Sequence, residues 1–128
     1  MSTVPVTALY GAMIAIFYVL LSLNVSRIRG QSGSTAHENL PEPLRLANRA
    51  HGNAAEYIPL GVLLLLTLEL SGGSSLWLHV FGGTLLVGRV LHAVGMIQKL
   101  GAAQVIGISL TWLTMVVEAI YLLVLRFR

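Results

Sequence analysis

Hydrophobic residues along the chain fall into four long runs, separated by one polar segment and two short connections. The runs extend over about residues 4–26, 46–71, 75–98 and 102–126. A bilayer core about 30 Å thick requires roughly 20 apolar helical residues, and each run reaches that length. The pattern therefore predicts four transmembrane helices in a single domain over residues 1–128.

The connections between the runs predict how the helices are joined. The polar segment of about residues 27–45 is the only substantial loop, and its helix-breaking residues are Gly30, Gly33, Pro41 and Pro43. The other two connections, SGGSS and QKLGAA, are tight. Because short connections join antiparallel neighbours, we expect an all-α integral membrane protein built as an up-down four-helix bundle.

Composition and charge exclude several classes of function. Hydrophobic residues make up 55% of the chain and charged residues 10%, whereas soluble domains average about 25% charged residues. The absence of cysteine excludes disulfides, cysteine nucleophiles and cysteine metal sites. The net charge is +3, but no basic block interleaved with aromatic residues lies outside the apolar runs. We therefore expect neither nucleic-acid binding nor a metal site.

The basic residues predict the orientation of the protein in the membrane. Cytoplasmic loops of membrane proteins carry an excess of lysine and arginine. The two loops at one face hold Arg27, Arg29, Arg45, Arg49 and Lys99, and the other face has only Arg126 and Arg128. The long loop is expected in the cytoplasm and both termini outside. The first run lacks a basic start and a clear cleavage site, so we interpret it as a retained span.

Polar side chains recur at helical spacing along the last three runs. Positions three, four, seven or eleven residues apart share one face of a helix. The polar residues at this spacing, or directly beside it, are Arg45, Arg49, Asn53, Glu56, Arg89, His92, Lys99, Gln104, Thr111, Thr114 and Glu118. Three of the four predicted helices therefore each have a polar face.

The depth of these residues decides which of them can meet. Glu56 and Arg89 lie about 15 Å and 14 Å from the cytoplasmic ends of their helices, at a rise of 1.5 Å per residue. An isolated charge there costs at least about 2.5 kcal/mol, which predicts that Glu56 and Arg89 pair or line a polar cavity. One interpretation is a ligand pocket open to the cytoplasm, with His92, Asn53 and Thr111 at a similar depth. The other is a buried ion pair that sets helix register, with Asn53 as an interhelical hydrogen bond.

Four other titratable residues are expected outside this cluster. Glu118 lies about 24 Å along its helix and cannot reach the cluster. Glu69, His79 and His37 lie near the membrane interfaces or in the loop. For these three we expect solvated side chains without a functional role.

Two segments, NRAHGNAAEYIPL and GRVLHAVGM, resemble the membrane-associated proteins in eicosanoid and glutathione metabolism, the MAPEG family. The pattern R-A-H-x-N-x-x-E followed by tyrosine and proline is met by Arg49, Ala50, His51, Asn53, Glu56, Tyr57 and Pro59. The third-span pattern G-R-x-x-H is met by Gly88, Arg89 and His92, and Arg27 matches an arginine that closes the first helix. Length, four spans and one long loop agree, so the resemblance covers essentially the whole chain.

The resemblance implies a homotrimer with sites between neighbouring protomers, where glutathione binds as co-substrate and a lipophilic second substrate arrives through the bilayer. The two carboxylates and the ammonium group of glutathione suit cationic side chains on one side and a carboxylate on the other. By resemblance, the glutathione-binding residues are Arg27, Arg49, His51, Asn53, Glu56, Arg89 and His92, with Gln104 and Thr111 as further candidates. The catalytic residue stays unassigned.

Four positions depart from the eicosanoid enzymes of the family. Those enzymes carry an arginine in the second helix where this chain has Gly52, and a tyrosine one turn beyond the third-helix histidine where it has Met96. They also carry an arginine, often with serine or tyrosine, entering the fourth helix, and this chain has Gln104 and Val105 there. The groups that would stabilise a glutathione thiolate are therefore mostly missing, and we expect weak activation of the thiol.

The leading hypothesis is a glutathione transferase or peroxidase of the membrane, acting on lipophilic electrophiles or lipid hydroperoxides. Its partners would be membrane lipid, a lipophilic small molecule and copies of itself in a bacterial inner membrane. The alternative is a non-catalytic lipid-binding or scaffold protein of the same fold. A small transporter is disfavoured because paired inverted repeats and mid-membrane breaks in two spans are lacking.

Overall fold

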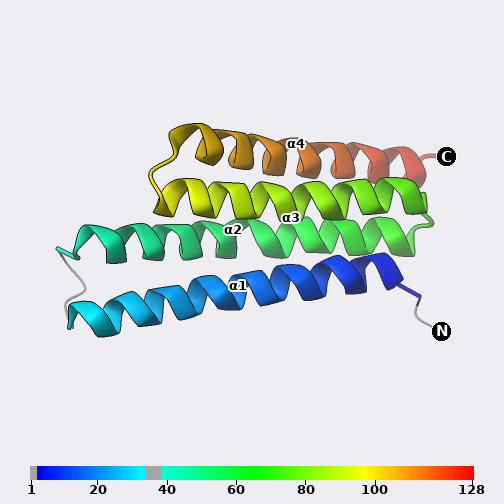
Figure 1. The fold of residues 1–128 in the computed structure, drawn as a ribbon. Helices are drawn as coiled ribbons and strands as arrows, with labels where there is room; N and C mark the ends of the chain where they lie inside the picture. Colours follow the sequence, from blue (N-terminus) through cyan, green and yellow to red (C-terminus); the bar gives the residue numbers. More distant parts are fainter. Residues whose placement is uncertain (1–2, 34–38) are drawn as a thin grey trace.

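The computed structural model describes residues 3–33 and 39–128. Within them the chain forms four α-helices: α1 (Pro5–Ser32), α2 (Glu42–Leu70), α3 (Ser75–Ile97) and α4 (Gly101–Arg126). All four are long and apolar enough to cross a membrane. The predicted all-α membrane fold with four spans is therefore confirmed (Figure 1).

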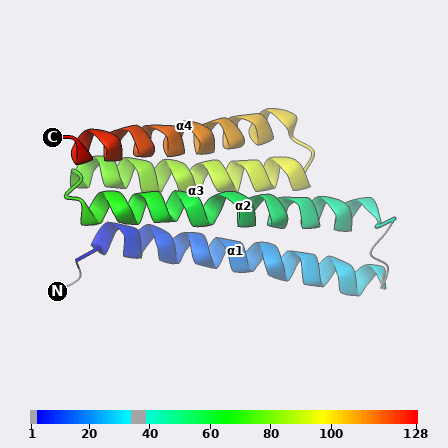
Figure 2. The same cartoon turned by 180° about the vertical axis from the view of Figure 1, so that it is seen from behind.

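The helices run up and down, and consecutive helices lie side by side. α2 and α3 form the central pair, α1 packs on one side of this pair and α4 on the other (Figures 1 and 2). Both termini lie at one end of the molecule, and the helix ends that lead from α1 to α2 and from α3 to α4 lie at the opposite end. α2 and α3 each contact all three other helices, so side chains of this central pair can join groups from several elements.

The connection between α1 and α2 is shorter than predicted. α1 continues through Gly30 to Ser32 and ends at Gly33, whose φ of 62° is the left-handed conformation that suits glycine. Pro43 lies in the first turn of α2, where its missing N–H costs no helical hydrogen bond. Only residues 33–41 separate the two helices, and 34–38 of them lie outside the described residues. Gly33 and Pro43 therefore mark the ends of long helices, and residues 27–32 and 42–45 of the predicted loop are helical.

Glu69 closes the N-terminal end of α1, so the prediction of a merely solvated side chain is wrong. Its two carboxylate oxygens accept hydrogen bonds from the backbone N–H groups of Val6 (2.9 Å) and Thr7 (2.7 Å). The first N–H groups of a helix have no partner within the helix, and the positive end of the helix dipole attracts a carboxylate. Glu69 thereby ties the end of α2 to the start of α1.

His79 and His37 are the other two residues that were expected to be solvated. His79 is exposed, as expected, and its Nδ1 lies 3.2 Å from the hydroxyl of Tyr10. The two rings meet edge to face with centroids 5.7 Å apart. His37 lies outside the described residues.

α3 and α4 approach each other closely because glycine faces glycine in their contact. A Cβ atom on Gly107 would lie 2.6 Å from the carbonyl oxygen of Gly88 and would also collide with the backbone of His92. Small residues at such crossings let transmembrane helices pack backbone to backbone. This close contact brings α4 next to the polar side chains of α3.

Candidate functional site

Arg89 lies at the centre of a buried polar cluster built from three helices. Only 1% of its surface is exposed. From α3, its Nη1 donates to the side-chain oxygen of Asn53 on α2 (2.7 Å), and its Nε donates to the hydroxyl of Thr111 on α4 (3.1 Å). The guanidinium also lies over the ring of Tyr57, 5.3 Å from its centre. The predicted meeting of Asn53, Arg89 and Thr111 at one depth is therefore observed.

The predicted ion pair between Glu56 and Arg89 does not form within the subunit. Glu56 is exposed, and among the described residues the salt bridges are those of Glu42 with Lys99 (2.8 Å) and Arg45 (3.8 Å). At about 100° per residue, the position after three residues lies about 60° away around the helix. Asn53 therefore faces α3 while Glu56 turns outward. The interhelical hydrogen bond of Asn53, which was one part of the alternative interpretation, is present without the ion pair of that interpretation.

His92 lies one turn after Arg89 on α3 and is 5% exposed. Its Nδ1 lies 3.0 Å from the backbone carbonyl oxygen of Gln104. A carbonyl oxygen can only accept, so Nδ1 donates, and in the neutral ring Nε2 is then a bare acceptor. Polar groups withdrawn from water are costly unless they are hydrogen-bonded. His92 is thus oriented by α4, with Nε2 left for another partner.

Two buried polar atoms of the cluster have no hydrogen-bond partner among the described residues: Nη2 of Arg89 and Nε2 of His92. One is a charged donor, and the other is an acceptor in the neutral ring. They lie three residues apart, on the same side of α3. The arrangement offers an N–H group for an anion beside an acceptor for a proton donor. This combination suits a ligand with both a carboxylate and an N–H or S–H group.

Other predicted site residues lie elsewhere in the single subunit. Arg27 is exposed near the end of α1 and donates to the side chain of Asn24 (2.9 Å). His51 stacks on Tyr18 with ring centroids 4.7 Å apart. Arg49 is exposed on the outward side of α2, as Glu56 is. The structure therefore unites Asn53, Arg89, His92, Thr111 and the backbone of Gln104, and it leaves these other residues outside the cluster.

Two residues near the polar faces have surroundings that were not predicted from the sequence. Tyr57 supplies the aromatic face for Arg89, and its spacing of four residues from Asn53 would have placed it on the same side of α2.

Glu118 is 0% exposed, and neither of its carboxylate oxygens has a hydrogen-bond partner among the described residues. It follows the helical spacing of Thr111 and Thr114, and the hydroxyl of Thr114 lies 2.8 Å from that of Thr84. Burial of this face of α4 could not be predicted from spacing alone.

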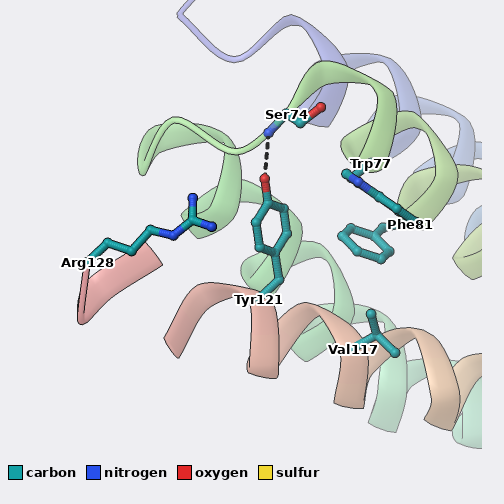
Figure 3. Close-up of a pocket in the computed structure, with 6 residues that line it drawn as sticks. All are labelled: Ser74, Trp77, Phe81, Val117, Tyr121 and Arg128. Atoms are coloured by element: carbon teal, nitrogen blue, oxygen red, sulfur yellow. Dashed lines mark hydrogen bonds between the residues drawn. The ribbon is translucent and has the colours of Figure 1, made fainter. Parts of the chain in front are cut away.

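A concave region, separate from the Arg89 cluster, lies between the start of α3 and the end of α4, at the end of the molecule that carries the termini (Figure 3). It has a volume of about 370 Å³, and the rings of Trp77, Phe81 and Tyr121 line it. The Tyr121 hydroxyl accepts a hydrogen bond from the backbone N–H of Ser74 (3.0 Å). Aromatic rings beside an arginine, here Arg128, are typical of the membrane–water interface. We interpret this region as an interfacial anchor.

Comparison with known proteins agrees with this architecture. The model of the MAPEG family matches residues 7–124. The chain is also 36% identical over 107 residues to the inner membrane protein YecN of Escherichia coli, in strain K12 and in strain O6:H1. That match covers 84% of this chain and 82% of YecN. With four transmembrane helices and a family match over nearly its whole length, the chain belongs to the MAPEG family.

Proposed function

We propose that the protein is a membrane-bound glutathione transferase or peroxidase that acts on lipophilic electrophiles or lipid hydroperoxides. The observation that carries this proposal is the pair of unsatisfied buried atoms, Arg89 Nη2 and His92 Nε2, in a cluster from three helices. Membership of the MAPEG family supports the same kind of activity. The four apolar spans would give a lipophilic substrate direct access from the bilayer.

The chemistry of glutathione fits the two free atoms. A carboxylate of the tripeptide would accept a charge-assisted hydrogen bond from Arg89, and His92 Nε2 would accept from an N–H or S–H group. In a transferase reaction, the thiolate forms a carbon–sulfur bond while the leaving group departs from the electrophile. In a peroxidase reaction, two thiols reduce a hydroperoxide to an alcohol and water and become a disulfide.

Activation of the thiol is expected to be weak. α4 has no basic residue before Arg126, and Val105, near its start, is apolar and 62% exposed. No charged donor of α4 is therefore available to stabilise a thiolate there. We expect glutathione binding in the micromolar to millimolar range with slow conjugation, and a faster rate in Gln104→Arg.

The absence of a charged donor on α4 that could stabilise a thiolate also favours a second candidate function, that of a lipid-binding protein without catalysis. That candidate and the proposed enzyme differ in whether glutathione binds at all. A protein that takes up lipid but shows no glutathione isotherm would fit the second candidate only.

The outward polar side of α2 supports assembly with copies of the same chain. Glu56 is exposed although it is the middle residue of α2, a helix of 29 residues. A charge facing hydrocarbon at that depth costs at least about 2.5 kcal/mol. A neighbouring copy that covers Glu56 and Arg49 would remove this cost and could bring Arg27 to the site. We propose a homotrimer in the bacterial inner membrane, with the α1–α2 connection facing the cytoplasm.

The test is calorimetric titration of the protein in nanodiscs with glutathione, followed by conjugation of 1-chloro-2,4-dinitrobenzene and reduction of cumene hydroperoxide. Arg89→Lys and His92→Phe should weaken glutathione binding while the protein stays folded. A matched control, Thr67→Val, changes a polar residue of α2 that bonds only to the backbone of its own helix in the described contacts. Absence of glutathione binding at millimolar concentration would contradict the proposal, and native mass spectrometry showing a stable monomer would contradict the trimer.

A further inference from the structure

A groove between α1 and α2 lies on the side of α2 away from the Arg89 cluster. Its volume is about 410 Å³, and its lining is mostly apolar, with Gly11 and Ala15 on α1 and Ala55, Pro59 and Val62 on α2. Asn53, which contacts Arg89, and Ala55 are two residues apart and so point about 200° apart around the helix. The groove is therefore separate from the Arg89 cluster.

Pro59 leaves the backbone of this groove incomplete. Proline has no N–H group, so the carbonyl oxygen of Ala55, four residues earlier, lacks its usual helical hydrogen bond. Ala55 and Pro59 are both exposed, and both line the groove. Hydrocarbon offers no donor to a backbone carbonyl, and an unsatisfied polar group in the membrane is costly. The groove thus combines an apolar surface with one acceptor that needs a donor.

Small residues and a ring stack give the groove its shape. Gly11 and Ala15 leave room on α1 opposite Ala55 and Pro59, and a Cβ atom on Gly11 would meet nothing within 4 Å. Tyr18 lines the groove nearer the α1–α2 connection, where its ring stacks on His51. An apolar chain therefore has room beside the carbonyl of Ala55 on the Gly11 side of this stack.

From this geometry we propose that the α1–α2 groove binds a single-chain lipophilic alcohol, whose hydroxyl group donates to the carbonyl oxygen of Ala55. The acyl chains of ordinary phospholipids fit the apolar walls but have no donor, so the carbonyl selects for a hydroxyl group. The proposal does not rest on glutathione chemistry, because the groove lies on the other side of α2.

The probe is a long-chain alcohol that carries a photoreactive diazirine, compared with its methyl ether, which has the same shape and no donor. Both are added to the full-length protein in phosphatidylcholine nanodiscs, and labelled peptides are quantified after irradiation. One hydrogen bond contributes about 1 kcal/mol, which predicts about five-fold more labelling of α1 and α2 by the alcohol than by the ether.

The decisive variant is Pro59→Ala, which supplies the missing N–H to the Ala55 carbonyl. Labelling by the alcohol should fall to the level of the ether, and labelling by the ether should stay unchanged and report an intact groove. The matched control is Pro43→Ala, which changes a proline in the first turn of α2 and should preserve the five-fold preference. Ala15→Leu narrows the groove and should reduce labelling by both probes.

Three results would overturn the proposal. The first is equal labelling of the wild-type protein by the alcohol and the ether. The second is a preference for the alcohol that survives in Pro59→Ala. The third is a loss of oligomeric mass in Ala15→Leu, because the groove would then hold a second copy of the chain. Glutathione binding measured on the same samples separates failure here from failure of the proposed enzyme activity.

Discussion

Arg89 on α3 and Asn53 on α2 are joined by a hydrogen bond of 2.7 Å between Nη1 and the side-chain oxygen, in a cluster where Arg89 is 1% exposed. The backbone oxygen of Asn53 lies 3.4 Å from the same nitrogen. A neutral amide, a hydroxyl group and an aromatic ring thus surround Arg89, where the sequence predicts a carboxylate partner. One terminal nitrogen of the guanidinium stays available for an anion.

Asn53→Ala is expected to destabilise the protein by about 2 kcal/mol, because a buried charged donor loses its partner. Thermal unfolding in detergent measures this loss. In double-mutant cycles with Arg89→Met, Asn53→Ala should show clear coupling, and Glu56→Gln should add to Arg89→Met within about 0.5 kcal/mol. Stronger coupling of Arg89 with Glu56 than with Asn53 would contradict the geometry of the site.

Gly107→Ala should separate α3 from α4, since the added methyl group collides with the backbone of His92. Overpacking of this kind costs typically about 1–3 kcal/mol. The melting temperature should fall, and glutathione binding should weaken with it because His92 and Arg89 depend on contacts with α4. Gly101→Ala is the control, because its Cβ atom would meet nothing within 4 Å. A change of equal size in both variants would show that the close approach is not the cause.

Glu69→Gln should loosen the start of α1. The amide retains one acceptor oxygen where the carboxylate has two, and it lacks the charge that favours a helix N-terminus. The loss expected for such a cap is about 1 kcal/mol. Hydrogen exchange at the backbone amides of Val6 and Thr7 should accelerate, while exchange near the middle of α1 should not. Glu42→Gln, which affects the exposed salt bridges with Lys99 and Arg45 at the other end of α2, should leave these two amides unchanged.

Glu118→Leu is expected to leave the protein equally stable or more stable, by about 1 kcal/mol. Glu118 is fully buried and its oxygens have no partner among the described residues, so an apolar side chain removes an unsatisfied polar group. Thermal unfolding of the wild type, Glu118→Leu and Thr114→Val gives the comparison. A large loss of stability in Glu118→Leu alone would mean that the carboxyl group has a partner in the assembled protein.

Much of the fold could be predicted from the order of hydrophobic and polar residues. Apolar runs of sufficient length determine that the chain crosses the membrane four times, and short connections determine that consecutive helices are antiparallel. The spacing of Asn53, Arg89 and Thr111 was also enough to place them at one depth, because the rise of a helix is constant. The helix ends were harder to predict. A helix can continue up to a glycine or a proline, so these residues do not show by themselves whether a long loop or only a helix end is present.

What the tertiary structure decided is which way each side chain faces and what it meets. Glu56 and Asn53 are only three residues apart, and the rotation of α2 against α3 turns one outward and the other toward Arg89. The start of α1 had to lie beside the end of α2 before the carboxylate of Glu69 could accept hydrogen bonds from the backbone N–H groups of Val6 and Thr7. Helical spacing groups residues on a face, but it does not specify which neighbour that face contacts, because the rotation of each helix is set by packing between helices.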